Sequence, residues 1–262
     1  MKTRFDAVSP EERDEAIASL EDVRERVLDR ARLVDDDTVL DVGTGTGLIV
    51  FGALDRLGAD GFVIALDVSV DCLEELRATC TDPRVVYLVG SAEVLPLPDD
   101  SVDVVTTRSV LIYVRDKAAA AREFFRVLRP GGRVSIFEPV NRRNTQLWEL
   151  VDFGDLAERV TADFYRRWPS DHPMQNFDAE DMTRWFHDAG FVEVEADVVV
   201  SSMTVTPDAV LHGIGAPGSP SLIDAWQEEF SPEEVAELEA AVRAAGPTEP
   251  QWPGLYLAAH KP

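Results

Sequence analysis

Residues 38–47 read TVLDVGTGTG, and the apolar run LIVFGALDRLG follows directly. The apolar run at 38–42 predicts a strand that is buried on both faces. Gly43, Gly45 and Gly47 then stand at alternate positions before a helix. Glycine accepts a positive φ and has no Cβ to hold a ligand away, and the start of a helix presents unpaired N–H groups. The stretch therefore predicts a strand, a bend and a helix that together receive an anionic group.

Three ligand classes compete for this bend. A nucleoside triphosphate loop would end in Gly-Lys-Ser/Thr, but Leu48 and Ile49 follow the last glycine. A dinucleotide loop needs G-x-G-x-x-G, and here Leu48 stands where its third glycine would fall. Asp67 ends the next apolar run, 20 residues after Gly47, where a βαβ unit brings a carboxylate to the ribose hydroxyls of a nucleoside. The spacing therefore disfavours a nucleoside triphosphate and a dinucleotide, and a nucleoside remains as the third ligand class.

Four blocks follow one another between residues 39 and 139: VLDVGTGTG, ALDVS, GSAEVLPLPDDSVDVV and EFFRVLRPGGRVSIFEP. In these blocks and their spacing the chain resembles the class I S-adenosylmethionine-dependent methyltransferases, in particular the small-molecule group related to the ubiquinone and menaquinone biosynthesis methyltransferases. The resemblance implies S-adenosyl-L-methionine as the cofactor and S-adenosyl-L-homocysteine as its product. It also implies a Rossmann-like methyltransferase fold.

The pattern of strands and helices agrees with that fold. Strands are predicted at 38–42, 62–67, 85–89, 102–107 and 133–138, with helices at 48–57, 70–80 and 116–128. Their alternation predicts an α/β fold: a doubly wound, mostly parallel sheet with helices on both faces. A valine-rich sixth strand is predicted at 191–201 and a last strand at 254–260. In the resembled family the last strand runs antiparallel between the fifth and sixth, which makes a seven-stranded sheet.

We expect a single methyltransferase domain over residues 1–262. Its parts are an N-terminal helical cap at 1–35, a cofactor-binding core at 36–140, and substrate and lid segments at 141–190 and 202–250. The second of these segments is a helical insert before the last strand. Ser9 is predicted to cap the first helix, Asp178 to cap a later one, and Ser231 with Glu234 to form a capping box.

Charge and composition limit the classes of partner that the protein is expected to bind. A net charge of −24 argues against binding nucleic acid, because no basic patch is available to release counterions. The charge would attract a cationic substrate, although an acidic, soluble surface is the simpler explanation. The N-terminus has no signal peptide pattern, and no apolar run approaches the length of a membrane span. We therefore expect a cytoplasmic monomer or homodimer with no membrane partner.

Cys72 and Cys80 lie eight residues apart on one predicted helix, with no neighbouring His or Cys. This spacing favours neither a zinc site nor a disulfide framework, so both are interpreted as buried structural thiols. No carboxylate cluster suitable for a metal is recognised either, and no metal is expected.

The resemblance implies a cofactor site at the carboxyl ends of the strands. Asp41 would serve the ammonium of the methionine end, and the loop N–H groups would face its carboxylate. Asp67 would accept both ribose hydroxyls, since the two oxygens of a carboxylate suit a vicinal diol; the alternative for Asp67 is a helix N-cap before Ser69. Ser91 stands where the family commonly has Asp, so the adenine contact would pass to a backbone group or to Glu93. The implied cofactor residues are Asp41, Gly43, Thr44, Gly45, Gly47, Asp67, Val68, Ser91, Ala92, Glu93 and Arg108.

Catalysis would depend mainly on alignment, because a sulfonium methyl group is already activated and orientation alone contributes about 7–11 kcal/mol. If a general base is used, His172 in WPSDHPMQNF is the first candidate. Tyr113 is the second catalytic candidate, as a hydroxyl that positions the substrate; its alternative is a ring packed in the core. Glu138 and Asn141, near the end of the fifth strand, are predicted substrate contacts, and Glu138 would meet a cationic amine.

The sequence therefore predicts methyl transfer from S-adenosylmethionine to an oxygen or nitrogen of a small-molecule acceptor, a specialised metabolite in this family group; carbon stays open. One alternative is a peptide amine or carboxyl terminus. Two others are a non-catalytic module that binds the cofactor and a nicotinamide-dependent oxidoreductase, which the glycine spacing disfavours.

Overall fold

The computed structural model describes residues 10–213 and 220–262, without the side chains of 10–13 and 15–16. Ser9, the predicted cap of the first helix, lies outside them. The chain clusters into two compact units. The unit that we call the sheet unit comprises Ser19–Arg142, Pro173–Val199 and Gly254–Pro262. The helical unit comprises Arg143–His172 and Val200–Pro253, together with the first helix up to Ala18. The predicted single domain and its internal boundaries stay a prediction.

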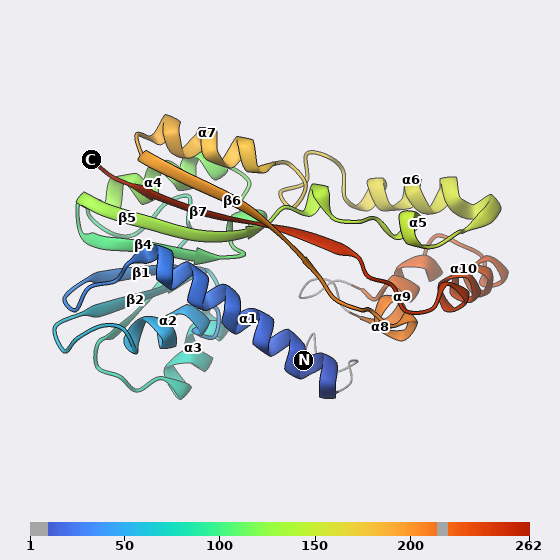
Figure 1. The fold of residues 1–262 in the computed structure, drawn as a ribbon, viewed down its shortest axis with the longest axis horizontal. Helices are drawn as coiled ribbons and strands as arrows, with labels where there is room; N and C mark the ends of the chain where they lie inside the picture. Colours follow the sequence, from blue (N-terminus) through green and yellow to red (C-terminus); the bar gives the residue numbers. More distant parts are fainter. Residues whose placement is uncertain (1–9, 214–219) are drawn as a thin grey trace. The chain divides into compact units, whose positions relative to one another are not determined.

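Seven strands form one sheet in the order β3-β2-β1-β4-β5-β7-β6 (Figure 1). The strands are β1 (Thr38–Val42), β2 (Phe62–Asp67), β3 (Val85–Val89), β4 (Val102–Arg108), β5 (Leu128–Pro139), β6 (Val192–Ser202) and β7 (Gln251–His260). The first five pair in parallel, and β7 runs antiparallel beside β5. The predicted doubly wound sheet is confirmed, including the antiparallel last strand between the fifth and sixth.

The strand order reverses between β1 and β4. From β1 the chain moves outward through β2 to β3, and it then returns to β4 on the other side of β1. Val42, the last residue of β1, is in register with Thr107 near the end of β4. In a doubly wound sheet, ligands bind in the crevice outside the carboxyl ends of the strands at such a reversal. The fold therefore directs attention to the loops that leave β1 and β4.

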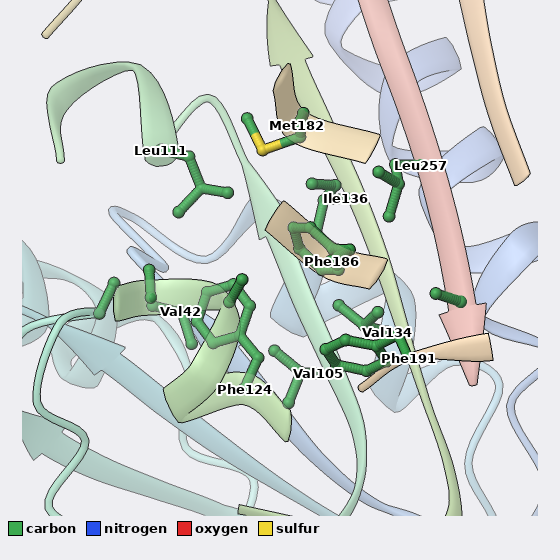
Figure 2. Close-up of a cluster of buried hydrophobic side chains, with 14 of the residues drawn as sticks. Val42, Val105, Leu111, Phe124, Val134, Ile136, Met182, Phe186, Phe191 and Leu257 are labelled. Atoms are coloured by element: carbon green, nitrogen blue, oxygen red, sulfur yellow. The ribbon is translucent and has the colours of Figure 1, made fainter. Parts of the chain in front are cut away.

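Helices cover both faces of the sheet (Figure 1). One layer holds α1 (Pro10–Ala31), α2 (Leu48–Leu54) and α3 (Val70–Thr79), and the other holds α4 (Lys117–Val127) and α7 (Ala179–Ala189). Along β1 the buried residues alternate, so that Val39 joins the first layer while Leu40 and Val42 join the second. Figure 2 shows the second layer, where Phe124 of α4 and Phe186 of α7 pack over the strands. Burial of β1 on both faces is thus confirmed.

The last turns of α1 belong to the core of the sheet unit. Val27 and Leu28 are fully buried with the residues of α2 and β1. A Cβ added at Gly52 of α2 would stand 2.6 Å from Leu28 Cδ1, so glycine is what lets the two helices approach. In this part α1 is a packing helix. Its role as a cap over the cofactor stays a prediction.

The boundary between α4 and β5 differs from the prediction. The helix ends at Val127 and the strand begins at once with Leu128, so the Pro-Gly-Gly segment lies inside β5 rather than before it. The cause is pairing at both sides of this segment: Leu128 is in register with Val102 of β4, and Gly131 N donates to Lys261 O.

The helical unit has its own core. Its helices are α5 (Leu147–Leu150), α6 (Ala157–Arg167), α8 (Pro207–His212), α9 (Leu222–Gln227) and α10 (Pro232–Ala245). Trp226 is 1% exposed and meets Phe153 edge to face, with ring centroids 5.9 Å apart. The capping box of Ser231 and Glu234 is confirmed at the start of α10. The predicted cap Asp178 is confirmed too, at α7 of the sheet unit. Within the described residues, no helix combines the length and apolar character of a membrane span.

Candidate functional site

The glycine bend after β1 takes the predicted left-handed conformations, with φ of 66° at Gly43, 54° at Gly45 and 94° at Gly47. A Cβ at Gly43 would stand 2.3 Å from Val110 Cγ2, and one at Gly47 would stand 2.3 Å from Leu76 Cδ1. Gly45 has no atom within 4 Å of its added Cβ. Two of the glycines are therefore needed for packing, and the middle one leaves open space above the backbone.

A cavity of about 260 Å³ opens at this bend. Its lining residues are Asp41, Gly43, Thr44, Gly45, Thr46, Leu48, Ile49, Cys72 and Arg108. Five of the predicted cofactor residues come together there. Cys72 was interpreted as a buried structural thiol, and this is wrong: it is half-buried in the cavity wall, whereas Cys80 is buried as expected. The signal that was missed is its position in the first turn after Ser69, facing the bend. We call this space the glycine-loop cavity.

Asp41 enters the glycine-loop cavity with an unsatisfied oxygen. The side chain is 2% exposed, and its Oδ1 accepts a 3.0 Å hydrogen bond from Thr106 Oγ1 of β4. Asp41 Oδ2 and Thr44 Oγ1 make no hydrogen bond of ordinary geometry to the described residues, although the Thr44 side chain lies close enough to Asp41 to lower its pKa slightly against the effect of burial. Burial raises the pKa of Asp41 to about 7. A buried acceptor without a donor is costly, so these two atoms indicate a ligand that brings hydrogen-bond donors.

Asp67 joins the bend to the start of α3. Its Oδ2 accepts from Gly45 N at 2.8 Å, and its Oδ1 accepts from Ser69 N at 2.9 Å. The N-cap of α3 is Ser69, whose Oγ accepts from Cys72 N, so the alternative of Asp67 as that cap is wrong. Each carboxylate oxygen keeps a second lone pair for a ligand hydroxyl. Val68, next in the chain, is 70% exposed and offers an apolar surface beside the carboxylate.

Residues 91–93 have partners within the sheet unit. Ser91 Oγ accepts from Glu93 N at 3.2 Å, and the Glu93 carboxylate accepts from Asp116 N at 2.9 Å. Ala92 is buried in the layer of α4 and α7. Their contact with an adenine ring stays a prediction.

The two catalytic candidates belong to different units. Tyr113 ends the short 3₁₀ helix η1 (Leu111–Tyr113) of the sheet unit and is 53% exposed, so the alternative of a core-packed ring is wrong. His172 belongs to the helical unit, where its half-buried ring meets Trp168 edge to face at 4.9 Å between centroids. Asn141, the first residue of η2 (Asn141–Arg143), is half-buried in the sheet unit.

Glu138 was predicted to contact the substrate, and its surroundings argue otherwise. The side chain is 0% exposed, and burial raises its pKa. Its oxygens accept from Thr107 Oγ1 and from the backbone N–H groups of Val110, Leu111 and Ile112. A substrate amine would have to displace these donors. The structure therefore uses Glu138 to hold the loop that follows β4, and its contact with a substrate stays a prediction.

Comparison with known proteins identifies the family. A family model described as "Methyltransferase domain" matches residues 40–136. The ubiquinone/menaquinone biosynthesis C-methyltransferase UbiE of Francisella philomiragia subsp. philomiragia is 30% identical over 170 residues, which is 61% of this chain and 68% of that protein. The chain belongs to the class I S-adenosylmethionine-dependent methyltransferases. The cofactor of this family is S-adenosyl-L-methionine.

Other relatives of this methyltransferase agree. The UbiE protein of Idiomarina loihiensis is 36% identical over 127 residues, 46% of this chain and 51% of that one. The methyltransferase thus spans about half to two thirds of the length of the curated relatives that it matches. Phosphoethanolamine N-methyltransferase 2 of Haemonchus contortus, solved in complex with S-adenosyl-L-methionine, shares the fold with a TM-score of 0.58, at 18% identity over 91% of this chain and 52% of that one.

The glycine-loop cavity fits the cofactor of the methyltransferase family. The unpartnered Asp41 Oδ2 and Thr44 Oγ1 suit an ammonium group, and the open backbone at Gly45 leaves room for a ligand. Asp41, Thr44 and the bend would hold the methionine end and Asp67 the ribose, and these roles stay a prediction. When bound, the cofactor supplies an activated methyl group on its sulfonium. The protein has to hold the donor in one orientation and to exclude water.

Proposed function

We propose that this methyltransferase acts on an oxygen or nitrogen of a small organic acceptor with an apolar or aromatic body. The observation that carries the proposal is the exposed side chain of Tyr113 on the loop whose Val110 packs against Gly43 of the glycine bend. A phenol there is able to donate to an acceptor atom and to orient it beside the donor.

The helical unit supports the apolar part of the proposal. Trp148, Phe164 and Tyr165 form an aromatic cluster with ring centroids 5.2–5.8 Å apart, and Tyr165 is exposed. Ligand sites are commonly lined by such rings with a few polar groups among them. We propose His172 of the same unit as the base where the acceptor needs one.

A second candidate is methylation at carbon. The relatives from Francisella and Idiomarina are named C-methyltransferases of ubiquinone and menaquinone biosynthesis. Their names favour an acceptor that resembles a quinone precursor, whose large flat rings also suit an aromatic cluster.

Incubation with S-adenosylmethionine labelled at its methyl group tests both candidates. Label is expected in one small product from a metabolite extract. With a ¹³C label, the NMR chemical shift of the transferred methyl group differs between oxygen, nitrogen and carbon, so the spectrum of the product separates the two candidates. Tyr113→Phe and His172→Ala are expected to lower turnover, by up to about a hundredfold for a true base. Asp67→Ala is expected to weaken S-adenosylhomocysteine binding about tenfold. Wild-type rates for both variants at saturating acceptor would remove Tyr113 and His172 from the chemistry.

A further inference from the structure

The loop that follows β4 is held at both ends by buried charges of opposite sign. This segment, which we call the post-β4 loop, runs from Arg108, the last residue of β4, to Val114 and contains η1. At its start lies the Glu138 carboxylate. Oε1 accepts from Val110 N at 3.0 Å and from Leu111 N at 2.9 Å, while Oε2 accepts from Ile112 N at 3.1 Å. Three consecutive N–H groups at the beginning of η1 are thus satisfied by one side chain.

Lys117 lies at the other end of the post-β4 loop. It is 2% exposed, and its Nζ donates to Val114 O at 2.9 Å, to Pro173 O at 2.9 Å and to Asn176 Oδ1 at 2.6 Å. The Phe177 ring lies over it, with its centroid 4.9 Å from Nζ. All three protons of the ammonium group are therefore used. Burial lowers the pKa of Lys117 to about 8, and the carboxylates of Glu138 and Glu93 act in the opposite direction.

The two charges complement the backbone of the loop between them. An anion at the N–H end and a cation at the carbonyl end of a helical turn both lower its electrostatic energy. Lys117 also ties the loop to Pro173 and Asn176, the segment with which the chain re-enters the sheet unit. Two buried charges cost desolvation energy, and apolar replacements of the same volume are often equally stable. Stability alone therefore does not account for them.

The post-β4 loop forms part of the site. Arg108 lines the glycine-loop cavity. Ser109 has a φ of 55°, a strained value for a residue with a side chain, and its N–H donates to Phe137 O. Val110 stands against Gly43, leaving no room for a Cβ there. Tyr113, with its exposed side chain, is the residue that we propose to orient the acceptor. A shift of this loop would move the cavity wall and Tyr113 together.

We propose that Glu138 and Lys117 are a pair of positioning residues that clamp the post-β4 loop, so that Val110 presses on the glycine bend and Tyr113 is presented at the cavity. Neither side chain touches the cofactor or the acceptor. The pair acts through the backbone that it holds. The proposal rests on the assignment of the glycine-loop cavity to S-adenosylmethionine.

The experiment measures S-adenosylhomocysteine affinity by titration calorimetry together with the melting temperature. Glu138→Gln turns an amide NH₂ toward backbone donors, and Lys117→Met leaves three acceptors without their donor. We expect each variant to weaken binding about tenfold. The fold loss of affinity in the double variant is expected to be much smaller than the product of the losses in the two single variants, because both residues hold one loop. Glu237→Gln, on the exposed face of α10, is the control and should leave binding and melting unchanged.

Two results would overturn the proposal. One is a lower melting temperature with affinity unchanged to within twofold, which is the behaviour of a purely structural pair. The other is full additivity of the two single variants. If Glu138→Gln does not fold, Thr107→Val removes one donor to Oε1 and Thr107→Ser restores it, with an expected two- to threefold loss and recovery; no loss in Thr107→Val then overturns the proposal. Failure of the wild-type enzyme to bind S-adenosylhomocysteine would instead refute the cofactor assignment.

Discussion

The sheet unit and the helical unit place their polar groups in different ways. In the sheet unit, carboxylates of Asp41, Asp67 and Glu138 are buried at the carboxyl ends of strands. In the helical unit the buried Asp163 is paired with Arg166 and Arg167 of its own helix, and the buried Ser221 caps α9. Buried polar groups thus hold loops at the carboxyl ends of strands in one unit, whereas they fix helices in the other. Cofactor binding should therefore depend on the first unit alone.

The largest expected effect tests whether the two cores are independent. Trp226→Ala removes the largest fully buried side chain of the helical unit and should cost about 3–5 kcal/mol of stability. Chemical denaturation measures this loss. Affinity for S-adenosylhomocysteine, titrated below the new melting temperature, should stay within twofold of the wild-type value. A loss of affinity that accompanies the loss of stability would show that cofactor binding depends on both units.

Gly43→Ala should have the next largest effect, this time on binding. The added methyl group would stand 2.3 Å from Val110 Cγ2, and residue 43 has a φ of 66°. Either the glycine bend or the Val110 side chain therefore has to move. We expect about a hundredfold loss of S-adenosylhomocysteine affinity, equivalent to about 2.7 kcal/mol. Gly131→Ala is the matched control, because Gly131 has a φ of 80° but open space around its Cβ position. Equal losses of affinity in the two variants would show that backbone strain, and not the clash with Val110, weakens binding.

The pH dependence of binding should report on Asp41. Its pKa is raised from 3.8 to about 7, so below pH 7 a proton has to leave before the carboxylate pairs with an ammonium group. Affinity for S-adenosylhomocysteine should therefore rise by up to about tenfold from pH 6 to pH 7 and level off above. Asp41→Asn should bind weakly with no such slope. A flat wild-type profile in calorimetry would exclude Asp41 from the ammonium site.

The same shift affects the stability of the ligand-free enzyme. Between pH 3.8 and 7 the folded state holds a proton on Asp41 that the unfolded chain has lost. The free energy of unfolding should therefore fall as the pH rises through this window, by at most about 1.4 kcal/mol per pH unit from this group. The loss should be smaller with S-adenosylhomocysteine bound, since its ammonium stabilises the ionised carboxylate.

The smallest expected effects come from a matched pair of helix caps. Ser69 Oγ accepts from Cys72 N at 3.2 Å in the sheet unit, and Ser231 Oγ accepts from Glu234 N at 3.3 Å in the helical unit. Ser69→Ala and Ser231→Ala should each cost about 1 kcal/mol in denaturation experiments. Only Ser69→Ala should also weaken cofactor binding, about twofold, since Asp67 holds Ser69 N and Cys72 lines the cavity. A binding defect in Ser231→Ala would contradict the separation of roles.

Much of the fold was predictable because its signals are local. The alternation of apolar runs and capping residues located β1 to β4 closely, and Asp178 and Ser231 marked two helix starts correctly. The end of α4 was misplaced, because the Pro-Gly-Gly segment is a helix stop in sequence but takes part in β5 through pairing with distant strands. Lys117 was missed altogether. At the start of a helix a lysine is normally exposed, and only Pro173, Asn176 and Phe177, more than fifty residues away in sequence, bury it.

Asp41 and Glu138 show which features follow from local sequence and which depend on tertiary contacts. Both are acids at or near the end of an apolar strand, and the sequence alone was sufficient to predict those strands, the glycine bend and the methyltransferase family. It did not distinguish the two carboxylates. Asp41 keeps an oxygen without a protein donor, whereas Glu138 accepts from three backbone N–H groups and a hydroxyl. The reason is physical: the backbone donors belong to the loop after β4, and whether they reach a carboxylate depends on how neighbouring strands end.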